Sequence, residues 1–165
     1  MNAFGDYPRM NAFVAWCQGS ALSAAIRSTK WTYPSIEILH IAGLVLVFGS
    51  ILVLNLRIFG RVLQQTPVRD VALGLAPLTL VGLCAQCVSG PLLFVATAMR
   101  FSANGAFRLK LVLLGVALLY HYGVHRPMAL ADLAGTSKLR RSAALSMLLW
   151  TSVILAGLGI ELLAG

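Results

Sequence analysis

The sequence predicts an all-α integral membrane protein: an up-down bundle of four transmembrane helices, preceded by an N-terminal helix at the membrane interface. The first observation is a set of long runs without Asp, Glu, Lys or Arg, at residues 38–56, 71–99 and 142–160. A helix crosses the bilayer core with about 20 apolar residues, so each run is long enough to span it. The second observation is composition. The chain is 59% hydrophobic and 11% charged, with a mean hydropathy of +0.85, and these values lie outside the usual range of soluble domains.

The chain length of 165 residues fits a single membrane domain over residues 1–165, without room for an appended soluble domain. Its start, MNAFGDYPRM, lacks the features of a cleaved signal peptide, so we expect it to be retained. The net charge of +8 does not form a continuous basic stripe. The basic residues flank the apolar runs, where they meet lipid headgroups, so we expect the lipid bilayer as a partner and no nucleic acid.

The first segment, residues 10–29, is only weakly apolar and contains Ser, Asn, Gln and small side chains throughout. This composition predicts an interfacial helix; were the segment to span instead, the N-terminus would change sides. Trp31 and Tyr33 follow at the expected level of the headgroups, and Pro34 favours a helix start. The first transmembrane helix is therefore predicted over residues 34–59.

Three further transmembrane helices are predicted over residues 71–99, 107–126 and 142–163. Pro77 and Pro91 should kink the first of these three. Because four spans are joined by short loops, they should form an up-down bundle with both termini on one side.

The third span is the weakest, because only fifteen uncharged residues separate Lys110 from Arg126, and Pro127 marks its expected end. The preceding FSANGAF should form a short turn, and the following ADLAGTSKLRR should form a loop. Seven basic residues lie on the side of the first and third loops and six on the other. This small excess favours the first and third loops inside the cell.

His40 is the leading candidate for a functional residue, because ionisable groups inside membrane helices are costly and are usually functional. It shares a helix face with Glu37, Gly43 and Val47. A neutral imidazole can be an axial haem ligand, and Gly43 would leave room for a flat macrocycle. The alternative is a histidine that hydrogen-bonds across the bundle, with Gly43 and Gly49 only permitting close helix approach.

His121 and His125 are spaced i, i+4 within YHYGVH, so their imidazoles should share a helix face. This arrangement suits copper or another divalent metal, and either residue could ligate haem. For His125, next to Arg126 at the membrane edge, the alternative is a solvated interfacial histidine. A single haem between His40 and His121 is disfavoured, because their expected depths differ by roughly 10–15 Å; two separate sites, or none, fit the spacing better.

Polar groups elsewhere in the spans favour structural roles. Cys84 and Cys87 share a face as CAQC and could join a soft-metal site, although small packing residues are the simpler interpretation. The neighbouring polar stripe is expected to pack and hydrogen-bond between helices; it contains Thr79, Gly82, Gln86 and Ser89.

Two carboxylates, Glu37 and Glu161, should lie on the side of the termini with Arg108 and Lys110, where ion pairing would lower their cost. A proton relay or a quinone-headgroup site is a further possibility for these carboxylates. No nucleophilic triad, P-loop or dinucleotide fingerprint is present in the sequence.

The run WTYPSIEILHIAGLVLVFGSILVLNLRIFG resembles the signature of a family of small bacterial inner-membrane proteins of unknown function. Their first span reads W-x-YP-x-(I/V)E-x-x-H-I-x-G and continues to DLRLLG. Further similarities are Pro77, SGPLLF, the FRLK that opens the third span, and SMLLW in the fourth.

The resemblance covers almost the whole chain. It implies a four-helix fold in the bacterial inner membrane but no activity, and it draws attention to five residues: Glu37, His40, Arg57, Lys110 and His121. Two positions depart from the family pattern: Asn55 replaces an aspartate, and Leu158 replaces an arginine. A salt bridge between these positions would be absent here.

Three functional hypotheses follow. The first is a b-type cytochrome-like electron-transfer module that binds haem b through His40, with His121 or His125 as the second ligand. The second is an accessory or assembly subunit that packs against partner membrane proteins or further copies of itself. The third is a protein that handles copper or another metal through His121, His125 and the two cysteines of CAQC.

Overall fold

A computed structural model describes residues 12–131, 133 and 135–162, and its described part is helical with no strand. Within this part, four helices are long and apolar enough to cross a membrane. They are α3 (Thr32–Ile58), α4 (Val68–Ala96), the continuous helix Gly105–Leu130, and α8 (Ser137–Leu162). The predicted all-α bundle of four spans is therefore confirmed.

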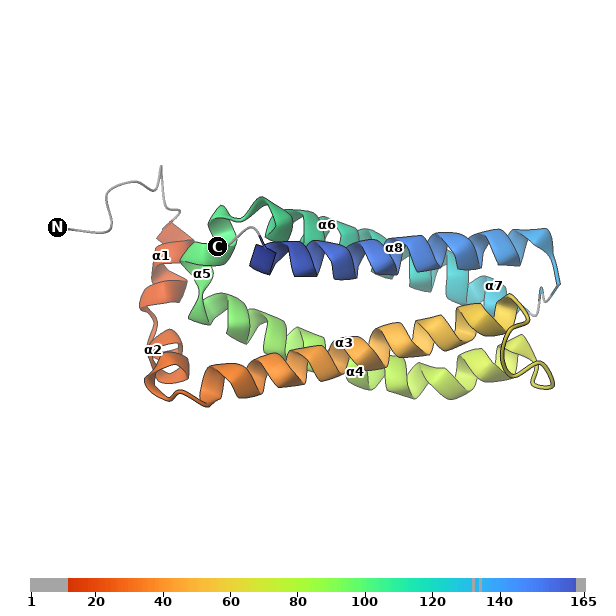
Figure 1. The fold of residues 1–165 in the computed structure, drawn as a ribbon, viewed down its shortest axis with the longest axis horizontal. Helices are drawn as coiled ribbons and strands as arrows, with labels where there is room; N and C mark the ends of the chain where they lie inside the picture. Colours follow the sequence, from red (N-terminus) through yellow and green to blue (C-terminus); the bar gives the residue numbers. More distant parts are fainter. Residues whose placement is uncertain (1–11, 132, 134, 163–165) are drawn as a thin grey trace.

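The long helices lie side by side, with α3 packed on α4 and the helix Gly105–Leu130 packed on α8 (Figure 1). The helix Gly105–Leu130 consists of α6 (Gly105–Tyr120), the π-helix η1 (His121–His125) and α7 (Arg126–Leu130). Its mean hydropathy, 1.4, is lower than the 2.0 to 2.3 of the other three spans. It is therefore the weakest span, as the sequence predicts.

The segment predicted as one helix over residues 10–29 forms two short helices in its described part, α1 (Ala12–Gly19) and α2 (Ala21–Ser28). They divide at Ser20, whose Oγ accepts a hydrogen bond from the backbone N–H of Ser23 and thereby caps α2. Both helices lie across the end of the bundle where α3 begins and α8 ends (Figure 1).

Arg27 attaches α2 to the end of α4. Its guanidinium donates to the backbone carbonyl of Ala96 at 2.9 Å and to the hydroxyl of Ser23, which in turn donates to the carbonyl of Val95 at 2.9 Å. The last carbonyls of a helix have no intrahelical partner and carry partial negative charge, so a cation stabilises them. The N-terminal helices are therefore docked on the bundle by a specific polar contact.

The boundaries of two connections differ from the prediction. The expected turn FSANGAF is largely helical, because α5 (Ala98–Ala103) follows a break at Thr97. Asn104 then caps α6 by accepting from the N–H of Ala106 at 2.8 Å. Helix α8 begins at Ser137, so part of the expected loop is helical as well.

Pro127 does not end the third span, contrary to the prediction. The helix continues through Leu130, and Pro127 sits in the first turn of α7 directly after η1. In η1 the backbone N–H of Arg126 bonds to the carbonyl of His121, five residues earlier. A proline ring clashes with the carbonyl four residues before it in a regular α-helix, and the wider π turn relieves that clash.

Helices α3 and α4 are in close backbone contact at Gly43 and Gly82. A Cβ atom at Gly82 would lie 2.7 Å from the carbonyl oxygen of Gly43. Below this crossing, Val47 and Ile51 pack with Trp150 of α8 in the middle of the bundle. This close contact fixes the relative position of α3 and α4. It therefore also fixes where their polar side chains lie relative to the helix Gly105–Leu130 and α8.

Candidate functional site

The π-helix η1 carries both histidines of the YHYGVH motif into the interior of the bundle. His121 is 4% exposed and His125 is 0% exposed. Their ring centroids are 5.8 Å apart. A π turn adds one residue to a helical turn and is frequent at functional sites. Two imidazoles are therefore buried side by side between apolar helices.

His125 is not the solvated interfacial histidine that its place beside Arg126 suggested. Its Nδ1 lies 3.0 Å from the Oγ of Ser142 on α8, and Tyr120 Oη donates to the same Oγ at 2.9 Å. Its Nε2 is buried and has no hydrogen-bond partner within the described residues. The π turn rotates His125 toward α8. The burial of this side chain therefore could not be predicted from its place near the expected end of the helix.

Three more buried polar atoms without a partner lie in this part of the described structure: Nδ1 of His121, Nε1 of Trp150 and Oδ1 of Asn55. The His121 ring stands edge-on to Trp150, with centroids 6.5 Å apart. Asn55 reaches α8 through its Nδ2, which is 3.4 Å from the Oγ of Ser146. Because an unpaired buried polar group is costly, such a concentration is typical of a functional site.

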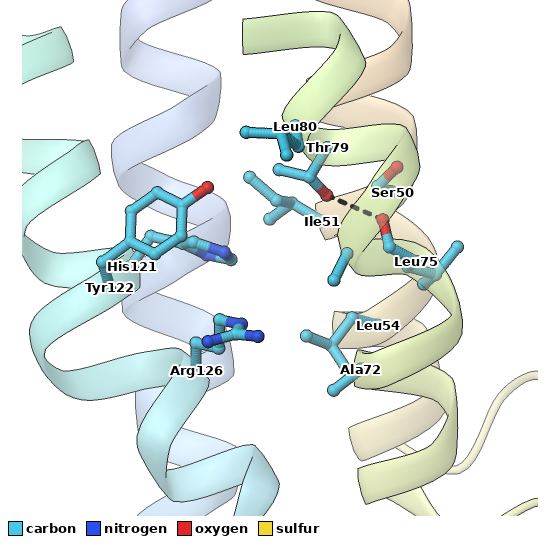
Figure 2. A pocket seen from close by; sticks show the side chains of 11 residues that line it. Ser50, Ile51, Leu54, Ala72, Leu75, Thr79, Leu80, His121, Tyr122 and Arg126 are labelled. Carbon is cyan, nitrogen blue, oxygen red and sulfur yellow. Dashed lines mark hydrogen bonds between the residues drawn. The ribbon is translucent and has the colours of Figure 1, made fainter.

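Beside His121 is a cavity of about 200 Å³, which Figure 2 shows between the helix pair α3–α4 and η1. His121 and Arg126 line one side of it, and both side chains point into it (Figure 2). The opposite walls are mostly apolar; they are formed by Ser50, Ile51, Leu54, Ala72, Leu75, Ala76, Thr79 and Leu80. Tyr122 also lines the cavity and, like Leu80, is exposed at the outer surface, by 44% and 60% respectively.

His40 lies in a different part of the bundle, against α4. Its Nδ1 is 2.8 Å from the Oγ of Ser89, and that Oγ donates its single proton to the carbonyl of Ala85 at 2.6 Å. We therefore assign the proton of the imidazole to Nδ1, which donates to Ser89. Nε2 carries the lone pair and makes no hydrogen bond among the described residues.

Two glycines make room around His40 and Lys110. A Cβ at Gly90 would lie 3.5 Å from Cε1 of His40, and one at Gly157 would lie 3.5 Å from Nζ of Lys110. His40 of α3 thus packs against α4 at Gly90, and Lys110 of α6 packs against α8 at Gly157.

Gly43, expected to leave space for a macrocycle beside His40, is instead covered by α4. A Cβ at Gly43 would be 3.0 Å from both Cβ of Ala85 and the carbonyl oxygen of Gly82. Gly43 therefore serves close helix packing, which was the alternative interpretation. At Gly49 a Cβ would meet nothing within 4 Å, so this second glycine has no packing role within the described part of the chain.

The histidines of α3 and η1 belong to two separate sites. His40 contacts Ser89 and Gly90, whereas the cavity beside His121 is lined by α4 residues no later than Leu80. Ser89 and Leu80 are nine residues apart on α4, or about 14 Å. Metal–imidazole bonds are about 2 Å long, so one metal ion does not join the two sites.

The polar stripe of α4 packs between helices, as predicted. Gln86 Nε2 donates to the backbone carbonyl of His40 at 2.8 Å, Ser89 holds the imidazole, and Gly82 contacts Gly43. Thr79 differs, because it lines the cavity while its hydroxyl donates to the carbonyl of Leu75 at 3.1 Å.

Other residues noted in the sequence lie apart from both sites. Cys84 and Cys87 are free and exposed on α4, and the described residues contain no group of three or more His, Cys, Asp or Glu that could hold a metal. Glu37 is exposed and forms no ion pair with Arg108 or Lys110 within the described part of the chain. The side chain of Glu161 lies outside the described residues.

Arg57 stabilises the loop between α3 and α4, donating through Nε to the carbonyl of Thr66 at 2.7 Å. Asn55 and Leu158, the two departures from the family pattern, are far apart. Asn55 contacts Ser146 on α8, and Leu158 lies twelve residues further along α8, about 18 Å away, with 59% exposure. These two positions are therefore not neighbours in this fold.

The sequence did not predict the roles of four residues in these sites. Ser142 contacts His125, Trp150 contacts His121, Gly157 contacts Lys110, and Arg126 lines the cavity. Ser142 and Gly157 gave no local signal, because their roles depend on how α8 packs against the third span. Arg126 followed by Pro127 was the available signal, since a proline inside an apolar run often accompanies a distorted helix.

No curated protein and no solved structure matches this chain. A family model matches residues 13–162, which is almost the whole chain and includes every residue of both sites. The signature in the first span predicted such membership. The chain belongs to DUF6644, a family of unknown function.

Proposed function

We propose that this protein is a small electron-transfer module of the bacterial inner membrane that binds a b-type haem through His40. The observation that supports this proposal is the hydrogen-bonded series from His40 Nδ1 through Ser89 Oγ to the carbonyl of Ala85. Histidines that ligate metals commonly donate their other ring N–H in this way, which sets the tautomer and raises the basicity of the ligand nitrogen.

The surroundings of His40 fit a haem in two respects. Nε2 keeps its lone pair and makes no hydrogen bond with a described residue, as an axial ligand requires. Gly90 leaves the Cε1 edge of the imidazole without a covering side chain, since a Cβ there would lie 3.5 Å from Cε1 of His40. The haem iron, when bound, would supply reversible one-electron transfer, while the chain supplies the ligand, its orientation and an apolar environment.

Haem at His121 has less support, because a cavity of about 200 Å³ is below the range of about 300–1,000 Å³ typical of cofactor-sized ligands. A copper-handling function also has less support, since Cys84 and Cys87 are exposed on α4, away from the cavity lining that contains His121.

An absorption spectrum tests the proposal. The protein is expressed with ample haem precursor and purified in detergent, and the Soret band and the reduced-minus-oxidised spectrum are recorded. We expect a b-type spectrum that is lost in His40→Leu. Ser89→Ala should retain membrane insertion but bind haem about 10–100-fold more weakly.

The matched control is Ser152→Ala, because Ser152 bonds to the carbonyl four residues earlier, as Ser89 does, but faces outward. A wild-type protein without a Soret band, or equal haem content in wild type and His40→Leu, would contradict the proposal.

A second candidate is an accessory subunit or homo-oligomer, favoured by glycines without partners inside the chain. At Gly115 and Gly123, on the exposed face of the third span, a Cβ would meet nothing within 4 Å. Such glycines allow close approach of another membrane helix. Cross-linking in native membranes, followed by the stoichiometry of the purified species, tests it; an isolated monomer would exclude it.

A further inference from the structure

The cavity beside His121 has the size of one substituted six-membered ring. An engineered cavity of about 150 Å³ in another protein accommodates benzene, and this one measures about 200 Å³. It therefore admits a single ring with small substituents, whereas the four pyrrole rings of a porphyrin need much more space.

The walls of the cavity separate into an apolar side and a polar side. Ser50 and Thr79 lie on α3 and α4, but both hydroxyl protons are already donated, to the carbonyls of Leu46 at 2.7 Å and Leu75 at 3.1 Å. The groups that remain as donors are on the other side: the His121 imidazole, the Arg126 guanidinium and the hydroxyl of Tyr122, a residue that is 44% exposed.

His121 is 4% exposed, and its Nδ1 has no partner within the described part of the chain. The guanidinium of Arg126 likewise makes no hydrogen bond or ion pair with any described residue, and it points into the cavity with the imidazole (Figure 2). A ligand that accepts hydrogen bonds would pair with both the imidazole and the guanidinium. A purely apolar ligand would leave both groups unpaired.

We propose that this cavity binds the headgroup of a lipophilic quinone. A benzoquinone is one flat apolar ring with carbonyl acceptors at its edge, which matches the volume, the apolar walls and the donors at His121 and Arg126. The cavity opens on the outer surface between α4 and η1, where Leu80 and Tyr122 are exposed. In a bilayer this opening faces lipid, so a long hydrocarbon tail remains among the acyl chains.

A phospholipid phosphate fits the cavity less well. A phosphate group is small, strongly hydrated and anionic. Proteins usually bind it with several cationic side chains or backbone N–H donors. Here one arginine stands opposite six apolar side chains: Ile51, Leu54, Ala72, Leu75, Ala76 and Leu80. These walls favour a ring that is apolar on both faces.

The quinone site deepens the proposed electron-transfer function by naming its partner, and in that sense it rests on that function. The binding test does not depend on haem. It is made on wild type and on His40→Leu, and both should bind quinone equally. If wild type binds no haem while quinone binding persists in both wild type and His40→Leu, the haem proposal fails and the quinone site stands.

The experiment measures binding of a short-tailed benzoquinone to the full-length protein in detergent. Trp150 is the reporter, because its ring is 6.5 Å from that of His121 and quinones quench indole fluorescence. Trp16 and Trp31, which are 70% and 67% exposed, are first replaced by Phe to remove their background. We expect saturable quenching.

Two variants change the cavity in opposite ways. Arg126→Gln removes a charged donor and should weaken binding at least about tenfold. Ala76→Phe fills the volume and should abolish saturable quenching. The matched controls are Arg61→Gln, an exposed basic residue in the loop after α3, and Val81→Phe, which adds a ring to α4 at a side chain that is 58% exposed. Both should bind as wild type.

Photolabelling with an azido-benzoquinone locates the ligand independently, and helical content measured by circular dichroism identifies any variant that fails to fold. Label should appear in peptides that contain residues 50–54, 68–80 or 121–130, which line the cavity. Wild-type affinity in folded Arg126→Gln and Ala76→Phe would overturn the proposal. So would label elsewhere in the chain, or displacement of the quinone by phosphatidylglycerol at equal concentration, which would assign the cavity to a lipid headgroup.

Discussion

The carbonyl oxygen of Gly43 lies 2.7 Å from the position that a Cβ would take on Gly82, so the backbones of α3 and α4 touch at this pair. The same position would be 2.8 Å from Cγ2 of Val47. Backbone cannot move aside as the end of a flexible side chain can. The crossing of the two helices therefore depends on the absence of a side chain at Gly82.

Gly82→Ala should separate α3 from α4 and lower the free energy of unfolding by about 1–3 kcal/mol, as overpacked cores do. Gly49→Ala is the matched control, because a Cβ there meets nothing within 4 Å; it should have no effect or raise stability slightly through helix propensity. Thermal unfolding in detergent measures both. Equal midpoints for the two variants would show that the contact is not tight in solution.

Ser142 and His125 should respond differently to substitution. Ser142→Ala leaves His125 Nδ1 without its partner and Tyr120 Oη with only the backbone carbonyl of residue 142, at 3.4 Å, so it should cost about 1–3 kcal/mol. His125→Leu removes one hydrogen bond but also removes the unpaired Nε2, so it should not lower stability. Thermal unfolding of both variants in detergent measures the two changes in stability. A larger loss in His125→Leu than in Ser142→Ala would mean that Nε2 has a stabilising partner.

Arg27→Gln should release α1 and α2 from the end of α4, because it removes the charged donor to the carbonyl of Ala96. Hydrogen exchange of the α1 and α2 amides should become about tenfold faster or more, while the amides of α3 remain protected. Lys30→Gln is the control, since Lys30 only lies over the ring of Trp31, 5.6 Å from its centroid. Unchanged exchange in Arg27→Gln would show that the remaining contacts, including the hydrogen bond from Ser23 to Val95, hold α1 and α2 without the arginine.

Single-cysteine accessibility tests the topology. In a chain whose own cysteines are replaced by Ala, Gln65→Cys and Thr136→Cys should react with a membrane-impermeant maleimide from the cytoplasm. Lys30→Cys and Arg108→Cys should react from the opposite side, because four spans alternate across the bilayer and basic residues favour the inside of the first and third loops. Labelling of Gln65→Cys and Lys30→Cys from one side would refute the four-span arrangement.

The number and order of the spans could be predicted from the sequence because hydropathy depends on each helix alone. A charge-free run such as 71–99 must satisfy its backbone internally wherever it packs. The helix pairing of α4 could also be anticipated, since Gly82, Gln86 and Ser89 recur at helical spacing and small or polar residues pack between membrane helices.

The polar core could not be predicted in the same way. The burial of His125 depends on the π turn before Pro127, and regular helical spacing contains no such turn. Lys110 contacts Gly157, and Asn55 contacts Ser146. Both contacts depend on how α8 packs in the bundle, and no local sequence pattern predicts that packing. Position along one helix predicted which residues were unusual, and only packing between helices identified their neighbours.

The π turn also affects how relatives of this protein should be compared. One additional residue in a turn rotates everything after it by about 100° around the helix axis. A family member that lacked this residue would present different side chains to the bundle from His125 onward, even with an otherwise identical sequence. An alignment across YHYGVHRP therefore needs a one-residue gap wherever the turn is regular, and without the gap an inward histidine would be matched to a lipid-facing neighbour.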